Sequence, residues 1–398
     1  MPDIFERLGL QRLVNVSGTE TPYGAAPVCA EVIAAVGELA PFSVRMAELQ
    51  SVASGVIARA VGVEAGCVTG CTAASIAMTV AAAMTGCDLG RAERLPDTSG
   101  MKNEVIFQKG HEVSYGQNVS QNIRLTGARV VEIGAATQCG GYQLRAAVTP
   151  QTAAALYVVS HLTVQNRLID LTTFCEICRE AEVPVIVDAA SMPDPRPYAA
   201  AGADLVLFSA HKSFASLTAG VIAGKKELVR ACIYQEHGIG RPMKVGKEGV
   251  VGAIAALERW MALDNDYQNT ALEARLRQAQ EKLSTLPGIA ISREKNQLKL
   301  HVAPAEAPIT AHGLAEALRA ENPSIIVWSQ LAEAGTLLVT LSKVSDETAD
   351  YVCDRIRDIC AKAKGVAAYT PAPNLGDAIV DELEKWPLKA GAELRHAP

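Results

Sequence analysis

The 398-residue sequence predicts an α/β protein with a mostly parallel central sheet and a smaller C-terminal α+β domain. Hydrophobic residues make up 49% of the chain but aromatic residues only 5%, so Ala, Val, Leu and Ile must build the core. Such an interior is typical of parallel sheets covered by helices on both faces. Short apolar segments also recur roughly every 20–30 residues, which is the spacing of βαβ units. After about residue 249 this rhythm changes, which indicates a second domain.

The strands of the main sheet are predicted from short apolar segments that contain β-branched residues. They lie at residues 104–107, 129–133, 155–159, 184–187 and 204–208. Two of the intervals between them, residues 171–181 and 191–200, have a helical pattern of apolar residues. Strands that alternate with helices in this way favour a doubly wound sheet with helices on both faces.

The C-terminal part of the chain begins with a long helical pattern over residues 249–283. Strands are predicted near residues 298–302, 325–328 and 336–341, and helices near 311–320 and 345–362. We therefore predict three parts. They are an N-terminal arm at residues 1–30, a large domain at 31–248 and a small α+β domain at 249–398.

Charge and cysteine content exclude several classes of protein. The chain has 37 Lys and Arg against 43 Asp and Glu, a net charge of −6, which disfavours binding to polyanions by bulk electrostatics. We expect no signal peptide and no membrane segment, because the longest apolar run, residues 76–84, is too short to span a bilayer. The ten cysteines lie mostly in apolar or helical segments, which favours a reduced, cytoplasmic protein. Cys175 and Cys178 form a CxxC without a second ligand pair, so no metal site is predicted.

Three polar features lie where an α/β sheet binds ligands. Asp188 ends the strand at residues 184–187, at the edge where ligands of such sheets lie. Lys212 follows the strand at residues 204–208, where partial desolvation favours an amine nucleophile. The small residues 70–72 open an Ala-rich helix, whose free N–H groups can face an anion. Each feature alone also has a structural interpretation as a cap, a solvated lysine or an ordinary turn.

Together these features give the sequence a family resemblance. It resembles the fold-type I pyridoxal-phosphate enzymes, and within them the group of bacterial selenocysteine synthase (L-seryl-tRNA selenium transferase) and D-glucosaminate-6-phosphate ammonia-lyase. The segments that carry the resemblance are residues 13–21, 69–74, 184–190, 202–212 and 240–248. The last segment is the most specific to this group. The resemblance implies an aminotransferase-like fold and pyridoxal 5′-phosphate as the cofactor.

The resemblance also implies roles for individual residues. Lys212 would carry the cofactor as a Schiff base and move the α-proton of the substrate, and Asp188 would pair with the pyridine nitrogen. The implied phosphate site consists of the main chain of Gly70, Cys71 and Thr72 with the side chains of Ser209 and His211. One departure is the segment Ser213-Phe214-Ala215, where relatives have small residues, and we expect it to make the pocket floor bulkier.

Further candidates follow two other strands. His111, after the strand at residues 104–107, lies where such enzymes place a ring over the cofactor, although an ordinary loop histidine fits the sequence as well. Ser160 and His161 follow the strand at residues 155–159, so one of them would contact the cofactor or the substrate. The alternative is a pair that stabilises a turn. Gln165 is a weaker candidate for contact with the substrate.

A cluster of cations provides candidates for binding the anionic groups of a substrate. Arg241, Lys244 and Lys247 lie in the segment most specific to the group. They could bind a substrate carboxylate or phosphate, or the cofactor phosphate of a neighbouring subunit, whereas the alternative is a solvated basic loop. Arg45 could also reach a carboxylate. Relatives carry an acidic or neutral residue near that position, which implies a different substrate.

The function expected from these features is α,β-elimination, as in an ammonia-lyase or dehydratase acting on a small amino acid or amino-sugar acid. Racemisation and transamination stay open as alternatives, as do selenium transfer to seryl-tRNA and non-catalytic binding of pyridoxal phosphate. A tRNA substrate is not expected, because the net charge is −6 and the core motif begins almost at residue 1. Selenocysteine synthase has a tRNA-binding domain in front of that motif. The resemblance also implies a homodimer or a larger homo-oligomer.

Overall fold

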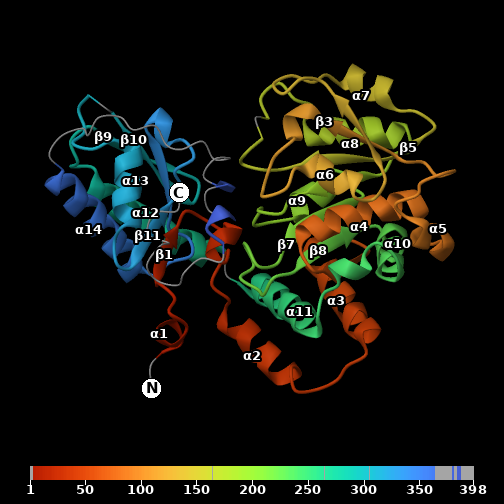
Figure 1. Ribbon diagram of the computed structural model, residues 1–398, viewed down its shortest axis with the longest axis horizontal. Coiled ribbons are helices and arrows are strands. Elements are labelled where there is room, and N and C mark those ends of the chain that lie inside the picture. The colour runs from red at the N-terminus through yellow and green to blue at the C-terminus, as the bar shows by residue number, and fades with distance from the viewer. Residues whose placement is uncertain are drawn as a thin grey trace. The chain divides into compact units, whose positions relative to one another are not determined.

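The structure is a computed structural model that describes residues 3–163, 165–263, 265–303, 305–363, 379–380 and 383–386 (Figure 1). The chain divides into two compact units. One comprises residues 26–263, and the other comprises residues 1–25 together with residues 264–398 as far as these are described. The sequence predicted the division at 248/249. It lies after residue 263 because the helix at Lys247–Ala262 packs against two helices of the large unit.

The large unit contains a seven-stranded sheet with the order β2-β8-β7-β6-β5-β3-β4. Its strands are β2 (Ala65–Thr69), β3 (Glu104–Gln108), β4 (Arg129–Ile133), β5 (Thr152–Val158), β6 (Val185–Asp188), β7 (Leu205–Ser209) and β8 (Gly220–Gly224). Strands β3 to β7 correspond to the five predicted strands and run parallel to one another. Only β8 is antiparallel to its neighbours β2 and β7. The predicted mostly parallel sheet is therefore confirmed.

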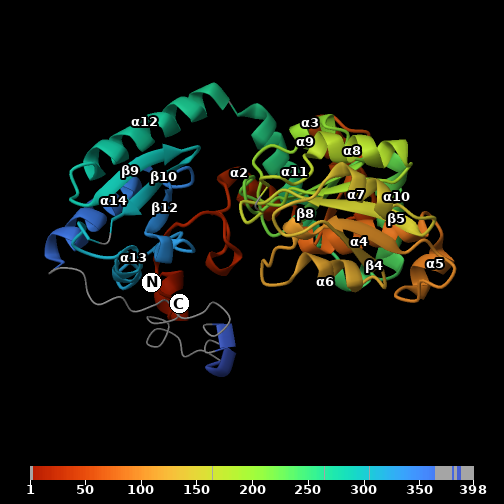
Figure 2. The ribbon, with the colours of Figure 1, turned by 90° about the horizontal axis from the view of Figure 1, so that it is seen from above.

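Helices cover both faces of this sheet. They are α2 (Ala30–Leu39), α3 (Met46–Val61), α4 (Thr72–Thr85), α5 (Leu89–Arg94), α6 (Val119–Arg124), α7 (Gly141–Ala147), α8 (Leu171–Glu180), α9 (Arg196–Ala200), α10 (Lys226–Tyr234) and α11 (Lys247–Ala262). Figure 2 shows α3, α8 and α11 on one side of the sheet and α4 and α6 on the other. Val185 and Val187 of β6 belong to the hydrophobic core on the side of the sheet that α3, α8 and α11 cover. Ile186 belongs to the core on the opposite side, which α4 and α6 cover. This alternation explains why the strands are apolar on both faces. The predicted helix at 191–200 begins only at Arg196, after Pro193 and Pro195.

The small unit contains two sheets. β1 (Leu13–Val16) pairs in parallel with β11 (Ser324–Val327), so the N-terminal arm belongs to this unit. The second sheet is antiparallel and comprises β9 (Ile289–Glu294), β10 (Gln297–Val302) and β12 (Thr336–Thr340). The helices are α1 (Ile4–Leu8), α12 (Asn265–Leu283), α13 (Ala311–Arg319) and α14 (Asp346–Lys362). Figure 2 shows α12 lying along β9 and β10, which it contacts. The long helix predicted over 249–283 is thus two helices, α11 and α12.

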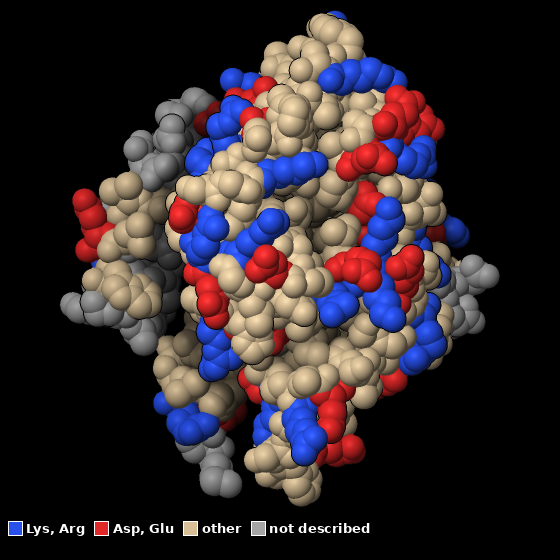
Figure 3. Space-filling view, turned by 90° about the vertical axis from the view of Figure 1, so that its right-hand side faces the viewer, with Lys and Arg blue, Asp and Glu red and all other residues tan. Residues whose placement is uncertain are grey.

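The surface and the cysteines bear on the classes of protein considered above. Figure 3 shows basic and acidic side chains interspersed on one face of the molecule. No helix of the described residues is long and apolar enough to cross a membrane. All ten cysteines are free thiols. Burial raises the pKa of Cys175 to about 11 and that of Cys178 to about 12, so the CxxC thiols are protonated at neutral pH.

Candidate active site

The carboxyl ends of β6 and β7 bring the two most important predicted residues to one edge of the sheet. β6 ends at Asp188, which pairs in register with Leu207 of the parallel strand β7. β7 ends at Ser209, and Lys212 follows directly in the loop that leads to β8. Because ligands of open α/β sheets bind at the carboxyl ends of the strands, both side chains lie at the expected place.

Asp188 is a buried carboxylate with few compensating partners. Its side chain accepts a hydrogen bond from the main-chain N–H of Ala190 at 3.1 Å. Burial raises the pKa of Asp188 to about 6, and the Ala190 N–H and the positive charge of Lys212 counteract this rise. The carboxylate therefore lies within electrostatic reach of Lys212. A buried negative charge of this kind is stabilised by any cationic ligand placed beside it.

The loop that carries Lys212 is fixed by main-chain hydrogen bonds and by an aromatic anchor. Ala215 N–H donates to the carbonyl of Lys212 at 3.3 Å. Phe214 is buried and packs against Phe208 and Trp260, with ring centroids 5.2 and 5.4 Å apart. Its bulk therefore fills the core between β7 and α11, and not the floor of a pocket as expected from the sequence. Ala215 has φ of +56°, a left-handed conformation that costs about 1 kcal/mol for a residue with a Cβ.

The turn at residues 70–72 precedes α4 and has the chemistry of an anion site. Cys71 caps the helix, and its Sγ accepts a hydrogen bond from Ala74 N–H at 3.4 Å. Thr72 Oγ1 is buried and has no hydrogen-bond partner among the described residues. A buried hydroxyl without a partner is costly unless a ligand completes its bonding. Together with the N-terminus of a 14-residue helix, it fits a phosphate group.

Two glycines allow close approaches to this turn. Gly70 N–H donates to the carbonyl of Met243 at 3.3 Å, and a Cβ on Gly70 would lie 2.8 Å from that oxygen. A Cβ on Gly220 would lie 2.4 Å from the carbonyl carbon and oxygen of Cys71. The structure therefore places the segment at 240–248 against the turn. Arg241 and Lys244 in that segment are exposed.

Ser209 and His211 form a pair beside Lys212. Ser209 Oγ and His211 Nδ1 are 2.9 Å apart, and the Ser209 side chain is buried. Burial and the neighbouring charge of Lys212 lower the pKa of His211, so its imidazole is neutral at neutral pH. Both residues lie at the sheet edge that carries Asp188.

His111 and Gln165 are brought together, but in a structural network. His111 is fully buried, and its Nδ1 accepts a hydrogen bond from Val158 N–H at 3.2 Å. Its Nε2 lies 3.0 Å from Gln165 Oε1, while Gln165 Nε2 donates to the carbonyl of Ile169 at 3.1 Å. The Tyr157 ring packs edge-on against the imidazole, with centroids 4.4 Å apart. Burial lowers the pKa of His111 to about 4, so the ring is neutral. The roles predicted for His111 and Gln165 stay predictions.

The other candidates follow β5 or directly precede α3. Ser160 Oγ accepts a hydrogen bond from Leu162 N–H at 3.1 Å, which matches the turn-stabilising alternative. His161 is exposed at the same edge of the sheet. Arg45 is exposed in front of α3 and pairs with Glu48 at 3.6 Å. The roles of these three residues in binding stay predictions as well.

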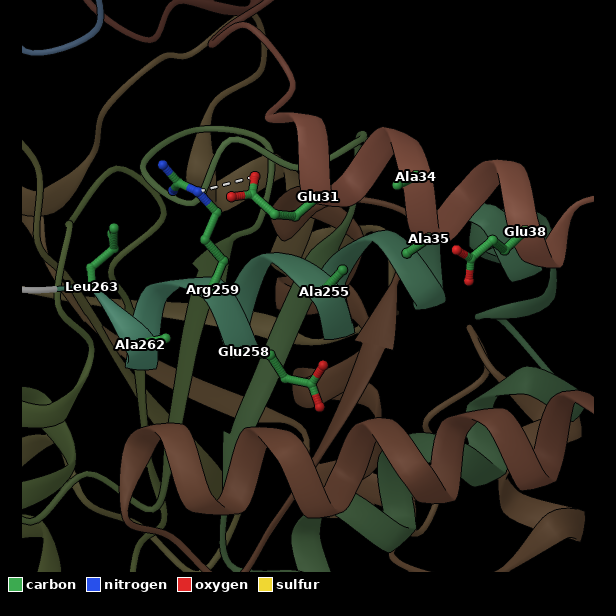
Figure 4. A pocket seen from close by; sticks show the side chains of 9 residues that line it. All are labelled: Glu31, Ala34, Ala35, Glu38, Ala255, Glu258, Arg259, Ala262 and Leu263. Carbon is green, nitrogen blue, oxygen red and sulfur yellow. Dashed lines mark ion pairs between the residues drawn. The ribbon is translucent and has the colours of Figure 1, made fainter.

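A separate hollow of about 610 Å³ lies between α2 and α11. Figure 4 shows its lining, in which Arg259 forms an ion pair with Glu31 at 3.3 Å. The lining residues are Glu31, Ala34, Ala35, Glu38, Ala255, Glu258, Arg259, Ala262 and Leu263. None of the predicted site residues lines this hollow, so we do not assign it to the active site.

Comparison with known proteins decides the family. The family model of L-seryl-tRNA selenium transferase matches residues 14–309. The chain belongs to this family. It is 34% identical to the D-glucosaminate-6-phosphate ammonia lyase of Salmonella typhimurium over 369 residues, which cover 91% of this chain and 99% of that protein. It is 35% identical to the 5′-C-glycyluridine monooxygenase-decarboxylase of a Streptomyces species, over 89% of this chain and 91% of that protein.

Solved structures agree with this assignment. A structure of D-glucosaminate-6-phosphate ammonia-lyase matches 91% of this chain and 99% of its own, with 33% identity and a TM-score of 0.82. The aspartate aminotransferase of Thermus thermophilus matches 89% of this chain and 93% of its own with a TM-score of 0.54. Its identity is 16%, so this likeness shows the fold alone. The predicted aminotransferase-like fold of this selenium transferase family member is confirmed.

Tyr115 lies near the candidate site although no sequence pattern pointed to it. Its hydroxyl accepts a hydrogen bond from Asn122 Nδ2, and it lies within electrostatic reach of Asp188 and Cys71. Tyr115 is in the segment at 112–118, which has neither a helical nor a strand pattern and matches none of the motifs shared with the family. Only its position in space relates it to the site.

The contact between Gly220 and Cys71 gives the first testable prediction. We expect Gly220→Ala to lower the free energy of unfolding by about 1–3 kcal/mol, because the added Cβ overlaps main-chain atoms that cannot rotate away. Pyridoxal phosphate should also bind more weakly, since the phosphate-site turn must shift. Urea unfolding and a cofactor titration measure the two effects. Gly37→Ala in α2 is the control, because nothing lies within 4 Å of its added Cβ. Equal stability of the two variants would contradict the prediction.

Proposed function

We propose that this chain is a pyridoxal-phosphate-dependent enzyme that catalyses α,β-elimination on a small amino acid or amino-sugar acid. The observation that carries the proposal is the position of Lys212 within electrostatic reach of the buried Asp188 at one sheet edge. The buried, unpartnered Thr72 hydroxyl at the start of α4 adds an anion site in the same unit. The 34% identical ammonia lyase is named for a reaction of this type.

The residues present fit this cofactor. Lys212 would hold it covalently, and Asp188 would face the pyridine nitrogen. The main chain of Cys71 and Thr72 with the Thr72 hydroxyl would bind the phosphate, whereas the N–H of Gly70, also predicted for this site, already donates to the carbonyl of Met243. When bound, pyridoxal phosphate supplies an aldehyde that reacts with amines and a ring that withdraws electrons from the substrate Cα.

Each residue then has a definite task. Asp188 holds a proton on the pyridine nitrogen, because the buried carboxylate is stabilised by a positive charge beside it. Lys212 Nζ, once displaced by the amine of the substrate, accepts the Cα proton. It can then deliver this proton to the hydroxyl group that leaves from Cβ. Ser209 holds His211 in place, and the neutral imidazole adds no positive charge that would compete with Lys212 for Asp188.

The exposed cations are proposed to bind the anionic groups of the substrate. Arg241 and Lys244 flank Met243, whose carbonyl accepts the hydrogen bond from Gly70 at the phosphate turn. The similar ammonia lyase acts, by its name, on a sugar acid that carries a carboxylate and a phosphate. Arg45 and His161 are further candidates for this role.

One alternative rests on a specific observation. The 35% identical relative is named a monooxygenase-decarboxylase, so a substrate that loses its carboxyl group is the second candidate function. Racemisation and transamination use the same deprotonated Cα. Selenium transfer to tRNA is less favoured because the net charge of −6 disfavours binding to a polyanion.

Product analysis tests the proposal. The cofactor-loaded protein is incubated with β-hydroxy amino acids and with amino-sugar acids, with and without a 6-phosphate group. We expect ammonia and a 2-keto acid in equal amounts from at least one substrate. Carbon dioxide with consumption of oxygen would instead establish the decarboxylase reaction, and an inverted amino acid would establish a racemase. Stoichiometric cofactor binding without α-proton exchange on any substrate would overturn catalysis altogether.

We further propose a cytoplasmic homo-oligomer. The ten free cysteines are compatible with a reducing compartment. Large apolar side chains are exposed on α2 and α3, namely Ile33, which is 61% exposed, and Val52, which is 57% exposed. Phe42, between the two helices, is 64% exposed. Large exposed apolar side chains on these successive segments support contact with a second copy of the chain.

A further inference from the structure

Two buried hydroxyl groups lie on either side of the turn at residues 70–72. Thr69 is the last residue of β2, and Ser75 lies near the start of α4. Thr69 is 2% exposed and Ser75 has no exposed surface. Their side-chain oxygens are 2.7 Å apart, so the pair joins the end of the strand to the start of the helix across the turn.

Both hydroxyl groups also reach the carbonyl oxygen of Cys71, inside the turn. Thr69 Oγ1 lies 3.1 Å and Ser75 Oγ lies 3.2 Å from this oxygen, which also accepts a hydrogen bond from Ser75 N–H at 3.0 Å. The two hydroxyl groups bring only two protons to these three oxygens. A separation of 2.7 Å is typical of a hydrogen bond between hydroxyl groups. One hydroxyl therefore donates to the other, and the second donates to the carbonyl.

Strand β8 encloses this group of oxygens from one side. Thr69 pairs in register with Gly220 of β8. A Cβ on Gly220 would lie 2.4 Å from the carbonyl oxygen of Cys71 and 2.6 Å from Thr69 Oγ1. Because β8 approaches so closely, water has no room on that side to take over the hydrogen bonds of a missing hydroxyl.

The direction of the Cys71 carbonyl determines the direction of the next N–H group. The peptide bond between Cys71 and Thr72 is trans and planar, so the Thr72 N–H points opposite to the carbonyl. Among the described residues, neither Thr72 N–H nor Ala73 N–H has an acceptor, as expected for the first N–H groups of a helix. The Thr72 hydroxyl, in a residue that is 7% exposed, has no partner there either. A bound anion would complete the bonding of these groups.

We propose that Thr69 and Ser75 are positioning residues that orient the Thr72 N–H toward the phosphate of bound pyridoxal phosphate. This inference rests on the proposed cofactor. A donor that is already held in place binds an anion more tightly than one that binding must first order. A serine in a helix also donates to the carbonyl four residues before it where no ligand binds. The contact with Thr69 across the turn distinguishes Ser75 from that ordinary case.

Titration of the apo protein with two ligands tests the inference without requiring turnover. Pyridoxal phosphate reports on the whole site, whereas pyridoxal offers the same aldehyde to Lys212 but has no phosphate. The ratio of the two Kd values therefore isolates binding of the phosphate group. This ratio is measured for the wild type, Thr69→Val, Ser75→Ala and the double variant.

Each single variant keeps one hydroxyl that can still donate to the Cys71 carbonyl. We therefore expect Thr69→Val and Ser75→Ala each to raise the Kd for pyridoxal phosphate roughly threefold. The double variant loses both donors, so its Kd should rise roughly thirtyfold, which is more than the product of the single effects. The Kd for pyridoxal should change less than about twofold in all three variants. Thr69→Ser keeps the hydroxyl and should have the wild-type ratio.

Thr79→Val is the matched control, because Thr79 carries a buried hydroxyl four residues further along α4. Its Oγ1 donates to the carbonyl of Ser75 at 2.8 Å, which is the same kind of bond that Ser75 makes to Cys71. Thr79→Val should have the wild-type ratio of Kd values, even where the loss of this bond lowers stability.

A wild-type ratio in the double variant would overturn the inference and leave the proposed function intact. Equal weakening of both ligands would also overturn it, because the two hydroxyl groups would then support the fold alone. If the double variant does not fold, the two single variants decide the question by the same criterion. A wild type that binds neither ligand would overturn the proposed function itself, so the two failures are distinguishable.

Discussion

Lys212→Ala should abolish covalent attachment of pyridoxal phosphate and lower kcat by roughly a thousandfold or more, since one amine provides both the attachment and the proton transfer. The loop that carries Lys212 is fixed by the main-chain bond from Ala215 and by Phe214 in the core, neither of which involves the amine. The variant should therefore fold normally. Its loss of activity would then report on chemistry and not on stability.

Borohydride reduction followed by peptide mass spectrometry measures the attachment directly. The wild type should carry the cofactor mass on the peptide that contains Lys212, and Lys212→Ala should carry it nowhere. Lys226→Ala is the control, because Lys226 is an exposed lysine at the start of α10. A reduced cofactor attached to another lysine in Lys212→Ala, with activity retained, would contradict the assignment.

The sequence predicted those parts of the site that local patterns determine. Asp188 ends one short apolar strand and Lys212 lies three residues after another, and the carboxyl ends of neighbouring parallel strands must meet at one sheet edge. The small residues at 70–72 could be recognised in the same way, because a turn followed by an Ala-rich run begins a helix. The five predicted strands, β3 to β7, and their parallel direction follow from the recurrence of short apolar segments at the spacing of βαβ units.

What the sequence could not predict depends on packing between distant segments. Phe214 was expected in a pocket floor, but only the fold shows that Trp260 of α11 lies opposite to receive it. Tyr115 lies within electrostatic reach of Asp188 and Cys71, although the segment at 112–118 has no local pattern that would place it there. The division at residue 263 has the same origin, since the packing of α11 on α2 and α3 assigns it to the large unit.

Asp188→Asn should have opposite effects on function and on the stability of the apo protein. Turnover should fall by roughly a hundredfold, because an amide cannot hold a proton on the pyridine nitrogen. The apo variant, in contrast, no longer buries a carboxylate whose pKa is raised from 3.8 to about 6. Such a group binds its proton more tightly in the folded state. The stability that Asp188 contributes is therefore complete below pH 3.8 and is lost as the pH rises through about 6.

Asp188→Asn does not lose this stability as the pH rises. Its free energy of unfolding, compared with that of the wild type, should therefore increase by up to about 3 kcal/mol between pH 4 and pH 8. Urea unfolding of both apo proteins across this range measures the difference. Asp194→Asn is a control whose stability should depend on pH in the opposite direction. The hydrogen bond from Arg196 lowers the pKa of Asp194, so the stability that this carboxylate contributes is present above its ordinary pKa. Parallel pH profiles for wild type and Asp188→Asn would contradict the raised pKa.

Added pyridoxal phosphate should stabilise the wild type more than Asp188→Asn, because only the carboxylate gains a cationic partner. An Asp188→Asn variant that is more stable than the wild type without the cofactor but inactive with it would thus identify Asp188 as a residue retained for binding the cofactor at a cost in stability.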